Sequence, residues 1–165
     1  MISQNKLKTQ NEIYLLIHNI RSTYNVGSIF RTADAANVKK IYLSGYTPAP
    51  IDRFGRIRQD ISKVSLGAEK IVPWESISDT KILFKSLKKE KVKIIGLEQD
   101  EKSIDYKKLK ISGKNLIILG EEVKGIERYM LDQCDEIVEI PMLGKKESLN
   151  VSVATGILLF SIIKL

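Results

Sequence analysis

The stretch NLIILGEEVKGIERYMLDQCDEIVEIP, residues 115–141, contains two short apolar runs separated by a segment with a helical pattern. Residues 115–120 and 136–141 are short, partly β-branched and bounded by glycine or proline, which is typical of buried strands. Residues 126–133 between them repeat apolar side chains at helical spacing. A strand, a helix and a second strand in this order indicate two parallel strands, because the crossing helix lets both run in the same direction.

The same alternation continues outward through the rest of the chain. Further strands are predicted at residues 13–18, 40–45, 70–73 and 93–98. Further helices are predicted at residues 26–37, 61–66, 76–90 and 148–163. This order favours an α/β fold with a mostly parallel sheet flanked by helices. The length of 165 residues fits a single domain covering residues 1–165.

Three predicted strands end in glycine- or proline-bearing segments, at residues 96–98, 119–122 and 140–142. The carboxyl ends of these strands can share one edge of the sheet although they lie far apart in the sequence. Ligands of open α/β sheets bind beyond this edge. The sequence therefore predicts a ligand pocket there.

The composition limits the classes of function. The net charge is +7, which favours a polyanionic partner, either nucleic acid or an anionic membrane surface. One cysteine, Cys134, and one histidine exclude an internal disulfide and the usual zinc sites, and we predict no metal. The N-terminus has no apolar signal core, and the apolar run 151–165 is shorter than the ~20 residues that span a bilayer. We therefore expect a cytoplasmic protein without a membrane segment.

Residues 19–38 combine an asparagine, a glycine and an arginine near the start of a predicted helix. Asn25 could cap this helix, and Gly27 would let another backbone come close. Arg31 follows among apolar neighbours, where a buried guanidinium needs a partner. The arginine either reaches solvent or pairs with an acid such as Asp34, or it grips a phosphate at the helix N-terminus.

An acidic loop, residues 120–125, begins and ends with glycine. Its spacing matches neither the phosphate-binding loop nor the dinucleotide motif. Glu121 and Glu122 would repel a phosphate, so they favour a neutral or cationic ligand. Cys134 lies on the apolar face of the following predicted helix, where a buried packing role is expected.

The start of the last helix is polar and basic. Ser148 could cap this helix, and Asn150 would lie in its first turn. Lys145 and Lys146 precede them and would make the mouth of the pocket basic. Both lysines are therefore candidate contacts for a polyanionic partner such as a nucleic acid.

The loop 51–60 contains half of the six arginines, namely Arg53, Arg56 and Arg58. The planar guanidinium group binds phosphates through two hydrogen bonds and stacks on bases, which lysine cannot do. Phe54 could add a stacking face. The loop is therefore a second candidate for nucleic-acid contacts, the alternative being a solvated connection.

Three segments together resemble the SpoU (TrmH-like) family of the SPOUT superfamily, whose members are RNA 2′-O-ribose methyltransferases. The segments are NVGSIFRTADAANV (25–38), LGEEVKGIERYMLDQCDEIVEIPM (119–142) and SLNVSVATGILL (148–159). The resemblance covers essentially the whole chain. It implies a C-terminal deep trefoil knot, S-adenosylmethionine (AdoMet) as methyl donor, and a homodimer whose interface includes the last helix. It also implies an RNA substrate, with tRNA expected before rRNA, and no separate RNA-binding domain.

The resemblance also implies individual site residues. Arg31 matches the family's catalytic arginine, and the other expected site residues are Asn25, Glu122, Ser148 and Asn150. The residues expected to contact AdoMet are Leu97, Glu98, Gly120, Ile140, Met142 and Leu149. The ribose 2′-oxygen would attack the sulfonium methyl group without a metal. Arg31 would either remove the proton or, because a guanidinium with a pKa above ~12 is rarely neutral, hold the phosphate and ribose.

Three other classes of function are weighed against this one. A knotted RNA-binding protein without turnover is disfavoured by the retained Asn25, Arg31 and Glu122. A doubly wound nucleotide-binding module is disfavoured because its characteristic glycines are missing. A membrane-surface role would need a basic amphipathic helix, whereas the last helix is apolar nearly all round. AdoMet affinity and methyl transfer would separate these possibilities.

Overall fold

Seven strands form one sheet in the computed structural model, which describes residues 11–163. The strands are β1 (Glu12–His18), β2 (Lys40–Ser44), β3 (Trp74–Ile77), β4 (Lys93–Leu97), β5 (Ile104–Asp105), β6 (Lys114–Leu119) and β7 (Glu136–Glu139). The helices are α1 (Thr23–Ala35), α2 (Gln59–Ser65), α3 (Ala68–Ile71), α4 (Thr80–Lys89), α5 (Arg128–Leu131) and α6 (Val151–Ile162), with a 3₁₀ turn η1 (Tyr106–Lys108). The polar residues 1–10 and the last two residues of the apolar C-terminal run lie outside the described residues.

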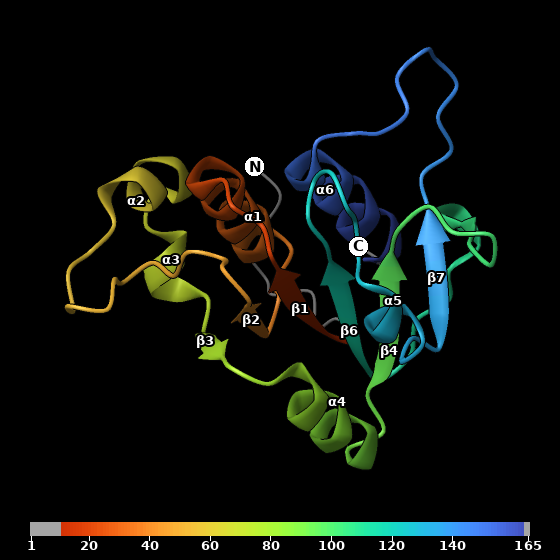
Figure 1. Ribbon diagram of the computed structural model, residues 1–165, viewed down its shortest axis with the longest axis horizontal. Coiled ribbons are helices and arrows are strands. Elements are labelled where there is room, and N and C mark those ends of the chain that lie inside the picture. The colour runs from red at the N-terminus through yellow and green to blue at the C-terminus, as the bar shows by residue number, and fades with distance from the viewer. Residues whose placement is uncertain (1–10, 164–165) are drawn as a thin grey trace, which may run out of the picture.

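The sheet confirms the predicted α/β class. Its strand order is β3-β2-β1-β6-β4-β7-β5, and every pairing between named strands is parallel. Helices α1 and α6 cover one face, with α2 and α3 packed beside α1, while α4 and α5 lie on the other face (Figure 1). The central strands are apolar without interruption because both faces of the sheet are buried.

Alternate residues of β1 illustrate the two-sided core. Leu15 and Ile17 point into the apolar cluster that includes α1 and α6. Leu16 points into the opposite cluster, beneath α4 and α5. Successive side chains of a strand face opposite sides, so a run of apolar residues at 15–17 supplies both cores at once.

Helix α1 begins one turn earlier than predicted. Ser22 caps it, since its hydroxyl accepts a hydrogen bond from the Asn25 backbone N–H at 3.2 Å. The prediction that Asn25 caps the helix is therefore wrong, and its side chain is free for other contacts. The close approach predicted at Gly27 is confirmed, because a Cβ there would lie 2.8 Å from the Ile61 carbonyl oxygen of α2.

The strand predicted at residues 70–73 is wrong. Residues 68–71 form α3, which follows Gly67 in the left-handed conformation at φ 92°. The sheet resumes at Trp74, directly after Pro73, whose carbonyl accepts a hydrogen bond from the Ile41 N–H at 2.9 Å. A short apolar run does not distinguish a strand from one helical turn, and proline lacks the N–H that a central strand needs.

Other predicted boundaries also shift. The helix predicted from residue 76 begins at Thr80, because Asp79 caps it by accepting hydrogen bonds from the Lys81 and Ile82 backbone N–H groups. The helix predicted at 126–133 is shorter, the predicted last helix starts at Val151, and β5 was not predicted. Caps and strand ends are set by local hydrogen bonds that apolar periodicity does not report.

The last helix, α6, is not covered on all sides by this chain. Val153 is 50% exposed and Phe160 is 51% exposed, although Leu158 and Leu159 are buried. The apolar surface that runs nearly all round this helix is therefore only partly covered within one chain. Across residues 11–163, no helix has the length and apolar character needed to cross a membrane.

Cys134 packs where the sequence predicted, against the apolar cluster beneath α5. Its thiol lies against β4, because a Cβ on Gly96 would be 3.2 Å from the sulfur. Burial raises the pKa of the Cys134 thiol to about 12. At pH 8 the native thiolate is therefore about 1,000-fold scarcer than in the unfolded chain, whose thiol has an ordinary pKa near 9.0.

We expect iodoacetamide to alkylate Cys134 about 1,000-fold more slowly in the native protein than in urea. The chain has one cysteine, so mass spectrometry reads this site alone. Because the folded state holds the thiol proton more tightly, Cys134 also makes the free energy of unfolding fall as the pH rises from about 9 to about 12. Equal alkylation rates in the two states would contradict the burial.

Candidate functional site

A cavity opens at the carboxyl edge of the sheet, where β4, β6 and β7 end. Its larger part has a volume of about 310 Å³ and adjoins a smaller part of about 100 Å³. Leu97, Ser148 and Leu149 line both parts. The cavity confirms the predicted pocket at the strand exits. All six residues expected to contact AdoMet lie in its walls, namely Leu97, Glu98, Gly120, Ile140, Met142 and Leu149.

Backbone glycines shape one wall of this cavity. A Cβ on Gly120 would lie 2.5 Å from the carbonyl carbon of Gly125 and 2.5 Å from the Ile126 nitrogen. The acidic loop turns back on itself there, since the N–H of Gly125 donates to the Glu121 carbonyl at 2.9 Å and the Glu121 N–H donates to the Gly125 carbonyl at 3.2 Å. Gly125 adopts φ 69°, which favours glycine. The two glycines therefore let the loop fold tightly against the end of β6.

Glu98 lines the cavity and also holds this loop. One carboxylate oxygen accepts a hydrogen bond from the Ile126 N–H at 2.8 Å, and the other accepts one from the Gln99 N–H at 2.9 Å. The Gln99 side chain donates to the Glu147 carbonyl at 2.7 Å. These bonds tie the end of β4 to the two loops that close the cavity.

Three predicted site residues from distant parts of the sequence form one hydrogen-bonded chain. The Asn25 amide donates to Glu122 at 2.8 Å, and its oxygen accepts a hydrogen bond from the Asn150 amide at 3.0 Å. Asn150 caps α6, because its side-chain oxygen accepts a hydrogen bond from the Ser152 N–H at 2.9 Å. Ser148, which was expected to be the cap, instead lines the cavity. The structure therefore joins α1, the acidic loop and α6 at the cavity mouth.

We expect the variant Asn25→Asp to be less stable than the wild type by about 1–3 kcal/mol at pH 8 and by less at pH 5. Asn25 is 6% exposed, and the substitution would place a second carboxylate against Glu122. The repulsion raises the pKa of one carboxyl in the folded state, so protonation at low pH relieves it. Urea unfolding of both proteins at the two pH values measures the difference. A destabilisation that does not grow with pH would contradict the expectation.

Arg31 lies in α1 but does not line the cavity. Its side chain is exposed, and no ion pair joins it to Asp34 or to another described residue. The neighbouring Thr32 faces α6, since its methyl group is 3.7 Å from the Cβ position of Gly156. Of the alternatives left open by the sequence, internal pairing with Asp34 is therefore wrong, and Arg31 is available to an external anion.

The predicted RNA contacts fall into two separate groups. The loop with Arg53, Arg56 and Arg58 extends beyond α2 at one end of the molecule, whereas the loop with Lys145 and Lys146 follows β7 (Figure 1). In the first loop, Arg53 and Arg56 lie 4.7 and 5.0 Å from the ring centre of Phe54, which is 65% exposed. Arg58 is half-buried at the start of α2. The two groups therefore do not form one patch on a single chain.

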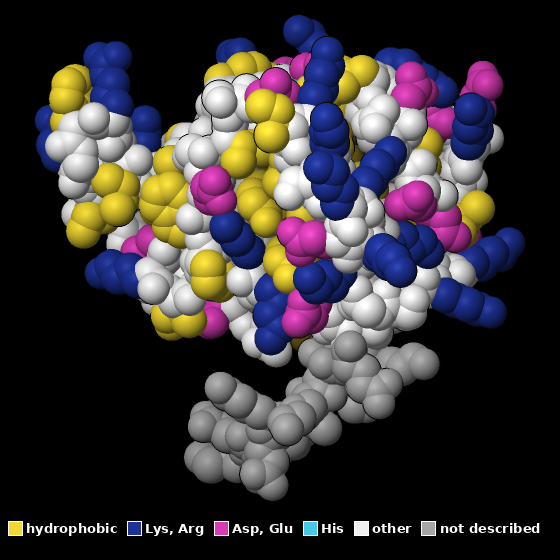
Figure 2. Space-filling model, turned by 90° about the horizontal axis from the view of Figure 1, so that it is seen from below, with side chains coloured by type: hydrophobic (Ala, Val, Ile, Leu, Met, Phe, Trp, Pro, Cys, Tyr) yellow, Lys and Arg dark blue, Asp and Glu magenta, His cyan; other side chains and the backbone are white. Residues whose placement is uncertain are grey.

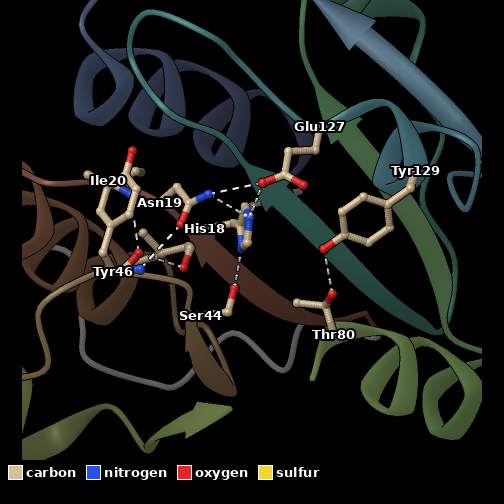
Figure 3. A network of polar contacts seen from close by, with 10 residues as sticks. His18, Asn19, Ile20, Ser44, Tyr46, Thr80, Glu127 and Tyr129 are labelled. Carbon is tan, nitrogen blue, oxygen red and sulfur yellow. Dashed lines mark hydrogen bonds and ion pairs between the residues drawn. The ribbon is translucent and has the colours of Figure 1, made fainter. Parts of the chain in front are cut away.

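A polar network that the sequence did not predict lies beside the site, at the ends of β1 and β2 (Figure 3). His18 Nδ1 is 2.7 Å from the Ser44 hydroxyl, and His18 Nε2 is 3.2 Å from the Glu127 carboxylate. The Asn19 amide donates to the same carboxylate at 3.1 Å. His18 is 6% exposed. The network links the segment before α1 to the start of α5. The one feature of the sequence that could have predicted a polar network here is the single histidine at the end of a predicted strand.

A sequence model of the SpoU rRNA Methylase family matches residues 12–160. The match includes the whole described sheet and every residue at the cavity mouth. The chain belongs to the SpoU rRNA methylase family. The predicted resemblance is therefore confirmed.

Curated SpoU-family relatives carry the name 23S rRNA (guanosine-2′-O-)-methyltransferase RlmB. The protein of Escherichia coli strain K12 is 32% identical over 150 residues, which cover 91% of this chain and 59% of the relative. The protein of Photobacterium profundum is 31% identical over 156 residues, which cover 94% of this chain and 61% of the relative. The chain thus spans about three fifths of the length of these relatives.

Solved structures of SpoU-type proteins share the fold. An AdoMet-bound rRNA methyltransferase from Sinorhizobium meliloti matches with a TM-score of 0.80 at 26% identity, over 91% of this chain and 55% of that chain. A TrmH/SpoU tRNA modifying enzyme from A. aeolicus matches with a TM-score of 0.80 at 25% identity, over 93% of this chain and 75% of that chain.

Proposed function

We propose that this chain transfers a methyl group from AdoMet to a ribose 2′-hydroxyl of ribosomal RNA. The observation that carries the proposal is the cavity, whose walls include every residue expected to contact AdoMet, in a chain of the SpoU family. The curated relatives named above act on 23S rRNA, so rRNA is now favoured over the tRNA expected from the sequence. Such a substrate would be encountered in the cytoplasm.

The residues of the cavity fit AdoMet. Leu97, Ile140, Met142 and Leu149 offer apolar contacts suited to an adenine ring. Glu121 and Glu122 line the larger part, where carboxylates suit a cationic ligand and repel a phosphate. When bound, AdoMet supplies an electrophilic methyl group on a positively charged sulfur.

The chain's own residues would orient the RNA. Asn25 holds Glu122 and Asn150 in fixed positions at the cavity mouth. Arg31 forms no ion pair with a residue that the structure describes. We therefore assign it a bidentate contact with the RNA phosphate and ribose at the target nucleotide. Positioning the 2′-oxygen in line with the methyl group is the main catalytic task, because alignment alone supplies much of the rate. We assign proton removal to the RNA phosphate or water, since a guanidinium is seldom neutral.

RNA would be bound by this domain itself. We propose that Arg53 and Arg56 contact phosphates while the exposed Phe54 ring stacks on a base. Lys145 and Lys146 would bind the RNA near the cavity, with Arg58 contributing less because it is half-buried. Two such separate groups suit a long RNA that crosses the domain.

We also propose a homodimer formed through α6. Val153, Ile157 and Phe160 lie at helical spacing, and the first and last of them are half-exposed. An apolar stripe of this kind is typical of a helix that packs against another protein surface. Light scattering is expected to give a dimeric mass for the wild type and a monomeric mass for Phe160→Glu. A monomeric wild type would contradict the proposal.

The deep trefoil knot implied by the family resemblance is a further proposal. The loops after β6 and β7 close over one cavity, and the Gln99 side chain bonds to the Glu147 carbonyl. A chain pulled from both ends should then stop short of its full contour length, because a tightened knot retains residues. Full extension in a single-molecule pulling experiment would exclude the knot.

Radiolabelled methyl transfer tests the activity. AdoMet labelled in the methyl group is incubated with rRNA and tRNA purified separately from cells that lack the protein, using the wild type and Arg31→Ala. Label in rRNA that survives alkali as a dinucleotide, and is absent with the variant, is expected. Label only in tRNA would overturn the proposal that rRNA is the substrate. AdoMet binding without label in either RNA would overturn the proposed methyltransferase activity and favour an RNA-binding protein without turnover.

A further inference from the structure

A second groove lies on the other face of the sheet, between α4 and α5. It has a volume of about 670 Å³, and Phe84 and Tyr129 contribute its apolar and aromatic surface. Its remaining lining residues are Lys81, Lys85, Lys88, Lys89 and Gln133. Viewed from the α4 side, Lys and Arg side chains run through the middle of this face, interspersed with Asp and Glu side chains and beside hydrophobic surface (Figure 2). The groove is separate from the cavity at the carboxyl edge.

Part of the positive charge on α4 is unfavourable for the helix itself, although Lys88 and Lys89 lie in its last turn, where the helix dipole favours a positive charge. Lys81, Lys85 and Lys88 lie four and three residues apart, so they share one side of the helix. Like charges at this spacing destabilise a helix by about 0.2–0.5 kcal/mol per pair. Lys81 also lies in the first turn, where the helix dipole disfavours a positive charge.

Nearby acidic groups do not neutralise these lysines. Asp79 caps α4, Glu90 pairs with Lys114 at 3.0 Å, and Asp132 pairs with Arg128 at 3.1 Å. Lys88 donates to the neutral Gln133 side chain at 3.0 Å. Within the described part of the chain, none of the four groove lysines forms an ion pair with a carboxylate. The groove therefore presents four lysine charges that no described carboxylate pairs with directly.

The groove leads away from the edge of the sheet that carries the candidate site. Helices α4 and α5 each follow the preceding strand or its loop, so their first turns lie toward the carboxyl edge (Figure 1). Thr80 and Tyr129 meet there, with their hydroxyls 2.8 Å apart, beside the His18–Glu127 network (Figure 3). Lys81 lies 5.9 Å from the Tyr129 ring centre at this end. Lys88 and Gln133 mark the far end.

We propose that this lysine groove binds the phosphate backbone of the substrate RNA after the strand has crossed the carboxyl edge. The inference rests on the proposed function in one respect, namely that the substrate is RNA. The charges from Lys81 to Lys88 extend over about 10 Å of helix, which suits successive phosphates of one strand. Tyr129 offers a ring on which a base can stack. The groove would hold RNA without reading its sequence, because phosphate contacts position a nucleic acid but do not specify it.

The test compares two triple variants in binding a single-stranded fragment of ribosomal RNA. The first variant is Lys81→Gln, Lys85→Gln and Lys88→Gln. The matched control is Lys107→Gln, Lys108→Gln and Lys110→Gln, which removes the same charge and includes a lysine 5.8 Å from a tyrosine ring, that of Tyr106. Each phosphate contact contributes ~0.7 to the slope of log affinity against log salt concentration for single strands. We expect the magnitude of this slope to be smaller by about 2 in the groove variant and nearly unchanged in the control.

Equal slopes for the two variants would overturn the proposal. AdoMet affinity is measured alongside and should match the wild type, and the thermal midpoint should not fall below that of the wild type, because the removed lysines repel one another. A lowered slope then cannot be attributed to misfolding. Methyl transfer by the wild type separates this inference from the proposed function. Methyl transfer by the wild type, together with a groove variant whose salt slope is unchanged, would refute only the proposal that the groove binds RNA. A lowered slope in the groove variant, without methyl transfer by the wild type, would refute only the proposed methyltransferase activity. A wild type that binds no RNA would refute both.

Discussion

Replacing Arg31 with lysine is expected to reduce methyl transfer by about 100- to 1,000-fold while AdoMet affinity stays unchanged. This is the loss typical when one preorganised hydrogen-bond donor at a reacting centre is removed. Lysine keeps the positive charge but cannot make the two parallel hydrogen bonds of a guanidinium to a phosphate. Single-turnover transfer to rRNA measures the rate, and calorimetry measures AdoMet binding. Near-normal turnover would show that Arg31 does not orient the RNA.

A loss of turnover in Arg31→Lys can be assigned to RNA positioning rather than to unfolding, because the fold does not depend on this side chain. Arg31 is exposed and has no ion pair among the described residues, so the free energy of unfolding should change by no more than about 0.5 kcal/mol. Arg128→Lys is the control, since that exposed arginine pairs with Asp100 and Asp132 and does not line the cavity. A similar loss of turnover in both variants would point to a general effect of arginine on RNA binding.

Replacing Gly120 with alanine is expected to lower the free energy of unfolding by about 1–3 kcal/mol and to weaken AdoMet binding at least about tenfold. The new methyl group would meet backbone atoms of Gly125 and Ile126 at 2.5 Å, and backbone cannot move aside as a flexible side chain can. The acidic loop would have to shift, and Gly120 through Gly125 line the larger part of the cavity. Urea unfolding and calorimetry with AdoMet measure the two effects.

Gly144→Ala is the matched control for Gly120→Ala. No atom lies within 4 Å of a Cβ built at Gly144, and its backbone is not in the left-handed region. The control should therefore keep both stability and AdoMet affinity. If Gly120→Ala behaved like the control, the tight loop against β6 would not be a condition for binding.

Much of the sheet was predictable from the sequence, for a physical reason. Parallel strands buried on both faces need short, continuous apolar runs, and the runs at 13–18, 40–45, 93–98, 115–120 and 136–141 all correspond to strands. The run at 70–73 failed because it is short and ends at a proline, so one helical turn was equally compatible with it. The strand β5 has two residues, too few to produce any periodicity.

The α/β class, the pocket at the strand exits and the family all follow from local features of the amino-acid sequence. Apolar runs, strand period and the residue types at strand ends are local properties, so short stretches of the sequence are enough to predict them. Which residues from distant parts of the chain come into contact depends on the tertiary structure. The strand order and the loop paths bring Asn25 to Glu122 and Asn150 and join His18 to Glu127. They also separate the arginine loop from Lys145 and Lys146, and they place the lysines of α4 and Tyr129 in one groove. These contacts and separations depend on how the helices and strands are ordered and packed in space. No local pattern of residues encodes that order.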